Sequence, residues 1–77
     1  MNKQRRKELT RIYNAIESLK DDLENIMCEE QESLDNMPES LQYSERGEQM
    51  AEYIESMDNT LGCLNDALDY IDEVINN

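Results

Sequence analysis

Several residue types are missing from this sequence, or nearly so, and each absence removes a class of function. Histidine, phenylalanine and tryptophan do not occur, and there are only one proline, two glycines and two cysteines. Without histidine, the chain lacks the side chain that most often acts as a general base or binds a transition metal. Cys28 and Cys63 form no CxxC pair, which argues against a zinc site and against a disulfide framework. We therefore expect no enzyme activity, no cofactor and no metal site.

Long apolar segments are missing as well. No stretch approaches the roughly 18 apolar residues that a membrane-spanning helix needs, and the N-terminus has no apolar segment typical of a signal peptide. Two isolated cysteines fit a reducing compartment. We expect a cytoplasmic protein that does not bind membranes and forms a single domain, residues 1–77, too short to bury a large core by itself.

Charge is plentiful but unevenly placed along the chain. Nineteen acidic residues against seven basic ones give a net charge of −12. Residues 1–11 contain five of the bases and one acid, so this end carries +4 and residues 12–77 carry −16. Proteins bind nucleic acids mainly through basic residues that neutralise phosphates, so we expect no direct binding of DNA or RNA. The acidic body should instead attract basic partners.

Apolar residues recur with the alternating three-and-four spacing of helices that pack along one stripe. In the first half of the chain this stripe consists of Leu9, Ile12, Ile16, Leu19, Leu23 and Ile26, with Tyr13, Met27 and Leu34 beside it. In the second half it consists of Met50, Ile54, Met57, Leu61, Leu64, Leu68, Ile71 and Ile75. The spacing predicts a first helix over about 3–34 and a second over about 45–75. Gly62 is not expected to interrupt the second helix, because one glycine costs only about 1 kcal/mol.

The segment between the two helices predicts a turn. Pro38 disfavours a helical conformation in the residue before it, and Ser44 is well suited to cap the second helix. Because so short a connection makes two helices antiparallel neighbours, the fold class is all-α, a long antiparallel helical hairpin. Further apolar residues flank both stripes, and one partner helix cannot cover them all. We therefore expect a homo-oligomer, at least a dimer and most simply a four-helix bundle.

Two groups of residues are candidate ligand sites. At the turn, Arg46 and the N-terminus of the second helix at Ser44 could hold a phosphate, while Tyr43 could stack on a base. The basic N-terminus, with Arg5 and Arg6, is the rival site. A plain capped turn is the alternative at the first site. At the second site the bases could simply be balanced by carboxylates that the hairpin brings to the same end, namely Asp69, Asp72, Glu73 and the C-terminal carboxylate.

The segment from Asp35 to Arg46, with the sequence DNMPESLQYSER, is flanked by a basic N-terminal helix and a closing heptad helix. In this combination the chain resembles short acidic proteins of phages and prophages of Gram-positive bacteria. The resemblance covers nearly the whole chain, and the loop segment is its most specific part. It implies a phage accessory protein that counters host defence. The size and helical design are also similar to phage sponges such as the sequestin family, which oligomerise and hold a nucleotide immune signal.

Three functions follow from these observations. The first is an anti-defence protein that sequesters a host nucleotide signal, either derived from ADP-ribose or a cyclic nucleotide, in pockets between subunits. The second is an acidic mimic of DNA that inhibits a nucleic-acid-binding enzyme, as some anti-CRISPR proteins do, and the charge of −16 on residues 12–77 favours it. The third is a structural coiled-coil scaffold without a ligand.

Overall fold

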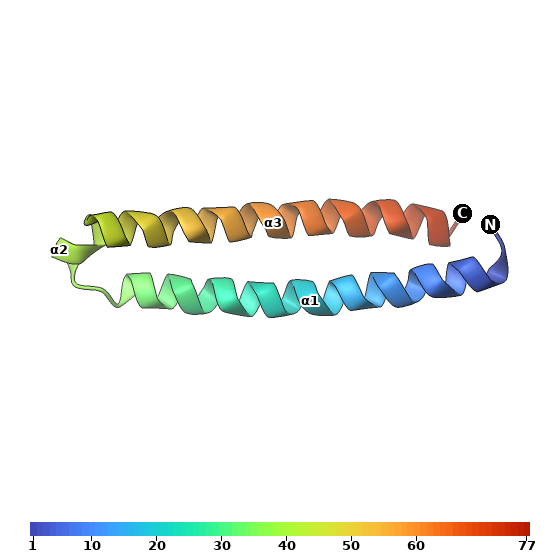
Figure 1. The fold of residues 1–77 in the computed structure, drawn as a ribbon, viewed down its shortest axis with the longest axis horizontal. Helices are drawn as coiled ribbons and strands as arrows, with labels where there is room; N and C mark the ends of the chain where they lie inside the picture. Colours follow the sequence, from blue (N-terminus) through green and yellow to red (C-terminus); the bar gives the residue numbers. More distant parts are fainter.

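The computed structural model describes residues 1–77 and contains three helices and no strand. The long helices α1 (Lys3–Asp35) and α3 (Glu45–Ile75) are antiparallel, and the short helix α2 (Glu39–Gln42) lies between them. Both termini lie at one end of the rod and α2 lies at the other (Figure 1); we call these the terminal end and the turn end. The rod has principal extents of 58, 15 and 13 Å. The predicted all-α hairpin is confirmed, with helix bounds that agree within one residue.

Local hydrogen bonds explain where α1 begins and ends. The Asn2 side chain caps its N-terminus, because Asn2 Oδ1 accepts a hydrogen bond of 2.8 Å from the backbone N–H of Arg5. At the other end, the N–H of Asn36 still bonds to the carbonyl of Glu32 at 3.0 Å. Pro38 then prevents the helix from continuing, since the residue before a proline avoids the helical conformation. The chain turns here as the sequence predicts.

The turn end is more compact than a simple loop, because α2 packs against the first turn of α3. Ser44 has an extended backbone and caps α3, with its Oγ accepting from the N–H of Gly47 at 3.4 Å, so the predicted cap is confirmed. Gly47 is buried, and a Cβ atom placed on it would lie 2.7 Å from the carbonyl oxygen of Leu41 and closer still to that of Gln42. Only glycine allows α2 to approach this closely. The sequence did not predict α2.

The inward side of α3 is the one that the sequence predicts. Each of its stripe residues is buried or half-buried, and Gly47 extends the same row toward the turn. We call this set the inner row of α3: Gly47, Met50, Ile54, Met57, Leu61, Leu64, Leu68, Ile71 and Ile75. The helix runs through Gly62 without a break, as expected.

The predicted stripe of α1 is wrong in part. Leu9, Ile16 and Leu23 face α3, but the exposed fractions of Ile12, Leu19 and Ile26 are 38%, 63% and 55%. The residues that face α3 form the inner row of α1: Leu9, Tyr13, Ile16, Lys20, Leu23, Met27, Glu30 and Leu34. This rotation places large apolar side chains inside as far as the turn, whereas the predicted stripe has no apolar member after Ile26. The cost is that Lys20 and Glu30 take inner positions.

The hairpin has almost no core of its own. Leu68, with 4% of its surface exposed, is the only buried hydrophobic residue, and no polar or charged side chain is buried. Two helices packed along a single seam leave the outer half of each one in water. None of the helices combines the length and the apolar character that crossing a membrane would require.

Candidate functional site

The candidate residues occupy opposite ends of a 58 Å rod. Tyr43, Ser44 and Arg46 lie at the turn end, whereas Arg5 and Arg6 lie in the first turns of α1 at the terminal end. Within one chain, the structure therefore does not bring the two groups together. Each group has to be considered as a separate site.

At the turn end, Arg46 and Tyr43 are free for an outside partner. The Tyr43 side chain is 78% exposed, and the exposed Arg46 guanidinium has neither a hydrogen bond nor an ion pair within the chain. Ser44 is already occupied, because its hydroxyl donates to the carbonyl of Leu41 as well as accepting from α3. The three side chains line no common cavity.

The hollow closest to this group is unfavourable for a phosphate. It lies on the first two turns of α3, has a volume of about 230 Å³ and contains three carboxylates among its four lining residues, Glu45, Glu48, Gln49 and Glu52. Carboxylates at a helix N-terminus are stabilised by the macrodipole, but they repel an anion that approaches the same N–H groups. Any anion at the turn therefore depends on Arg46.

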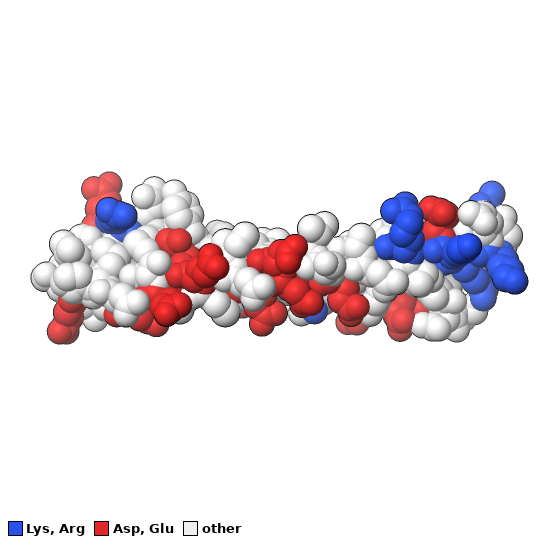
Figure 2. Space-filling model, turned by 90° about the horizontal axis from the view of Figure 1, so that it is seen from below, with Lys and Arg blue, Asp and Glu red and all other residues white.

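At the terminal end, the basic residues gather on one tip of the rod, as the blue cluster in Figure 2 shows. Their only ion pair is local, between Arg11 Nε and Glu8 Oε2 at 3.3 Å. The predicted balance with the carboxylates of α3 does not take the form of ion pairs, because no basic side chain lies within 4.0 Å of one. The first turn of α1 contains no acidic residue. The partial positive charge of the helix N-terminus therefore adds to the positive potential of the bases.

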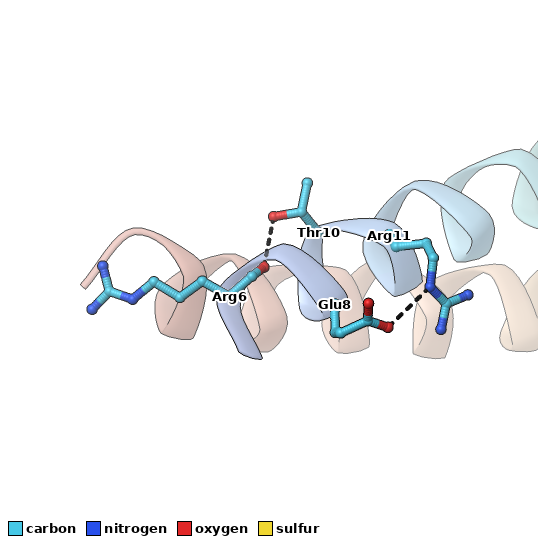
Figure 3. Close-up of polar contacts among 4 residues, drawn as sticks. All are labelled: Arg6, Glu8, Thr10 and Arg11. Carbon is cyan, nitrogen blue, oxygen red and sulfur yellow. Dashed lines mark hydrogen bonds and ion pairs between the residues drawn. The ribbon is translucent and has the colours of Figure 1, made fainter. Parts of the chain in front are cut away.

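Arg6 differs from the other bases at this end. Its side chain extends over the end of α3, away from the pair formed by Glu8 and Arg11 (Figure 3), and its Nη2 donates to the main-chain oxygen of Asn77 at 2.5 Å. Its Nε is buried and has no hydrogen-bond partner. Beside it lies an open hollow of about 280 Å³ that is lined by Met1, Arg6, Glu73, Val74 and Asn77. Arg6 therefore joins the start of α1 to the C-terminal residue Asn77, and its charge is less available to an outside ligand than the charges of the other bases.

A third feature lies midway along the rod and was missed by sequence reasoning. Lys20 reaches across from the inner row of α1, and its Nζ donates to Asn65 Oδ1 at 2.8 Å. A groove of about 370 Å³ surrounds this bond, lined by Lys20, Glu24, Met27, Asp58, Leu61, Gly62 and Asn65. A signal for it exists in the sequence, since Tyr13, Lys20, Met27 and Leu34 recur every seven residues. That spacing places the lysine in a row that packs against another helix.

The groove also marks an acidic flank of the hairpin. Partial burial raises the pKa of Tyr13 above its ordinary value of 10.0, and the carboxylates of Glu17, Asp72 and Asp69 raise it further. The two outward side chains of the groove that are acidic, Glu24 and Asp58, come from different helices. Carboxylates of both helices therefore share this flank. No three acidic or cysteine side chains converge closely enough to hold a metal ion, and both cysteines are exposed and free.

The carboxylates of α3 are confined to one side of that helix. Relative to the inner row, none of the nine acids of α3 directly precedes an inner residue; they lie on the side of the groove and around the back of the helix: Glu45, Glu48, Glu52, Glu55, Asp58, Asp66, Asp69, Asp72 and Glu73. The remaining sector contains no carboxylate; we call it the acid-free side of α3. It consists of Arg46, Gln49, Tyr53, Ser56, Thr60, Cys63, Ala67, Tyr70 and Val74.

No protein-family model, no curated protein and no solved structure matches this chain.

Proposed function

We propose that this chain is a non-catalytic binding protein that acts as a homo-oligomer and presents its carboxylates to a basic partner, blocking a nucleic-acid-binding enzyme in the way that DNA would occupy it. The segregation of charge carries the proposal. All nine carboxylates of α3 share one side of the helix, while the opposite side has none. Such an arrangement keeps one surface for assembly and leaves the other strongly acidic.

The charge density of the rod supports a mimic of nucleic acid. A net charge of −12 on a rod of 58 Å is one charge per about 4.8 Å, from 58 divided by 12. Two copies packed along their full length would carry one charge per about 2.4 Å, which approaches the roughly 1.7 Å per charge of duplex DNA. A basic groove that binds phosphates would therefore meet a comparable field along the assembled rod.

A competition experiment tests this proposal. A fluorescent DNA duplex is bound to each of a panel of bacterial nucleic-acid enzymes, including restriction endonucleases and RNA-guided nucleases, and the protein is added. We expect release of the duplex from at least one enzyme, with an affinity that falls steeply as the ionic strength rises. Release that is independent of salt, or from no member of the panel, would contradict the proposal.

Two charge-reversal variants identify the surface responsible. Replacing Glu52, Glu55 and Asp69 by lysine removes acids from the carboxylate side of α3, all of them exposed. Replacing Glu17, Asp21 and Glu32 by lysine changes the net charge equally on α1, at exposed positions that do not directly precede inner residues, and serves as the matched control. The first variant should lose inhibition to a larger extent than the second while both keep their helicity. Equal losses would indicate a response to net charge alone.

A second function, sequestration of a phosphorylated nucleotide in an anti-defence role, rests on the state of Arg46. This guanidinium has no partner within the chain, and the exposed ring of Tyr43 lies on the same tip. Bidentate contacts from a guanidinium to a phosphate are among the stronger polar interactions, and aromatic rings can stack on a base. ADP-ribose derivatives and cyclic dinucleotides are the ligands to examine.

Thermal stabilisation by these nucleotides separates the two candidate positions. If the turn holds the ligand, Arg46→Ala abolishes the stabilisation and the double variant Arg5→Ala, Arg6→Ala retains it. The reverse result assigns the ligand to the terminal end. Stabilisation that survives in both variants would show that neither group binds it. A protein that no nucleotide stabilises would leave the acidic surface as its functional feature.

A further inference from the structure

One flank of the hairpin is apolar on both helices. On α1, Ile12, Leu19 and Ile26 directly precede the inner residues Tyr13, Lys20 and Met27 and point outward, whereas the acids Glu8, Asp22 and Glu29 precede other inner residues. On α3, the residues that directly precede the inner residues Ile54, Leu61, Leu68 and Ile75 lie in the acid-free side; they are Tyr53, Thr60, Ala67 and Val74. In an antiparallel pair of helices, residues that precede the seam on one helix share a flank with those that precede it on the other. We call the following seven residues the apolar flank: Ile12, Leu19, Ile26, Tyr53, Thr60, Ala67 and Val74.

The groove on the other side of the seam confirms this geometry. Glu24, Asp58 and Asn65 line it, and each of them directly follows an inner residue of its helix. The residues that follow inner positions thus meet on the groove side. Those that precede inner positions meet on the opposite side, where Leu19, Ile26 and Tyr53 are each more than half exposed.

The accessible area of the hairpin leaves room for an interface of ordinary size. It is 5957 Å², whereas a compact monomer of 9.1 kDa would expose about 4,900 Å² by the usual scaling. The excess is about 1,000 Å². A standard protein interface buries about 800 Å² on each partner. One interface along the apolar flank would therefore bring the exposed area of the chain close to that of a compact protein.

We propose that the apolar flank is the surface on which a second copy of this chain docks, with the two hairpins placed end over end. This inference deepens the proposed self-association by naming its surface and its direction. A symmetric dimer uses the same patch on both subunits, and this patch is the one where two chains of charge −12 can approach with the fewest carboxylates between them. No other side of the rod combines exposed apolar residues with an absence of acids on α3.

Charge complementarity sets the direction. The terminal end carries the bases of residues 1–11, at +4, while the turn end carries three acids, Glu39, Glu45 and Glu48, against the single base Arg46. Figure 2 shows most of the positive side chains gathered at one end of the rod. If two copies ran in the same direction, both basic ends would meet. Turning one copy end over end places each basic end beside the acidic turn of the other, which is favourable at both ends of the dimer.

Sedimentation of two matched variants tests the surface. The double variant Leu19→Lys, Ile26→Lys places two charges on the apolar flank, and the double variant Asn25→Lys, Asn59→Lys places two charges at exposed positions of α1 and α3 outside it. We expect a wild-type dimer of about 18 kDa, twice 9.1 kDa, at about 100 µM. The dissociation constant should rise at least about a hundredfold in the flank variant and stay within about twofold in Asn25→Lys, Asn59→Lys.

Disulfide trapping tests the direction and does not depend on the stability of a monomer. In a Cys28→Ser, Cys63→Ser background, Val74→Cys and Arg46→Cys lie equally far along α3 from Thr60, near the middle of the helix. End-over-end docking predicts efficient cross-linking only when the two variant chains are mixed. Val74→Cys chains that cross-link with each other show docking in the same direction and overturn the proposed arrangement. Asn59→Cys, on the carboxylate side, is the control and should not cross-link.

The same measurements distinguish a wrong docking surface from an absence of self-association. A dimer that survives both lysines on the apolar flank overturns the choice of surface but leaves self-association intact. A wild-type chain that sediments as a monomer of 9.1 kDa at about 100 µM overturns both.

Discussion

The two long helices are almost equal in length but differ in how their apolar residues are arranged. From Met50 to Ile75, the inner row of α3 is apolar at every position. The inner row of α1 includes Lys20 and Glu30, while a second apolar row with Ile12 and Leu19 stays exposed. The side of α3 that faces inward is therefore determined by α3 itself. The side of α1 that faces inward is a choice between two rows, and the hairpin uses only one.

This difference explains how one hairpin can serve two contacts. Lys20 tolerates its inner position because its long aliphatic stem packs along the seam while its ammonium group reaches Asn65 at 2.8 Å. The half-polar inner row suffices to pair α1 with α3. The outward apolar residues Ile12, Leu19 and Ile26 then remain for a second partner, which a helix with a single stripe could not offer.

The largest expected effect comes from the one buried hydrophobic residue of α3. Leu68→Asp would bury an unpaired charge at a cost of several kcal/mol, which is comparable with the whole stability of a small domain. We expect loss of the helical circular dichroism signal at 25 °C. Asn59→Asp adds the same charge at an exposed position of the same helix and should remain folded. Similar signals in the two variants would show that the seam contributes little.

The two glycines should respond in opposite directions to the same change. A Cβ on Gly47 would collide with backbone carbonyls of α2, so Gly47→Ala should destabilise the protein by about 1–3 kcal/mol. A Cβ on Gly62 meets no atom within 4 Å. Gly62→Ala should therefore stabilise it by up to about 1 kcal/mol through helix propensity. Urea denaturation measures both changes, and a stable Gly47→Ala variant would mean that α2 is not packed as described.

The polar inner positions of α1 offer a direct test of its rotation. Lys20→Leu with Glu30→Leu completes an apolar inner row, and we expect stabilisation by about 1–3 kcal/mol from apolar surface removed from water. Ser18→Leu with Asn25→Leu adds the same side chains at exposed positions of α1 and is the control. If the control gains as much stability in urea denaturation, α1 does not face α3 with the inner row that contains Lys20.

Much of this fold could be predicted because its determinants are local. Ser44 and Pro38 mark the turn, and the uninterrupted stripe from Met50 to Ile75 orients α3. The rotation of α1 could not be predicted from its first half, because Ile12 and Tyr13 begin rows of similar apolar character. The row that faces α3 in the structure is the one that continues to Leu34, close to the turn. Helix α2 was missed because its four residues carry no periodic signal.

The residues of the candidate sites also differ in how far the sequence alone predicts their positions. Tyr43, Ser44 and Arg46 are neighbours in the chain, so the sequence alone places them at one tip. The groove around Lys20 depends on the register of α1 against α3, which brings residues 45 positions apart into contact. The spacing of apolar residues within each helix does not specify how α1 is aligned along α3. The rows that flank the seam could be derived only after the rotation of α1 was known.

The smallest expected effect is a dependence of stability on alkaline pH through Tyr13, whose pKa in the folded chain is raised above 10.0 by partial burial and by Glu17, Asp72 and Asp69. Between the unfolded and folded pKa values the unfolded chain holds fewer protons, so the free energy of unfolding falls as pH rises above about 10. Below that pH the contribution does not change. Tyr13→Phe should therefore flatten the decline of urea stability between about pH 9 and pH 11. Tyr70→Phe removes the same hydroxyl from an exposed position of α3, and an equal flattening in both variants would contradict the placement of Tyr13 between the helices.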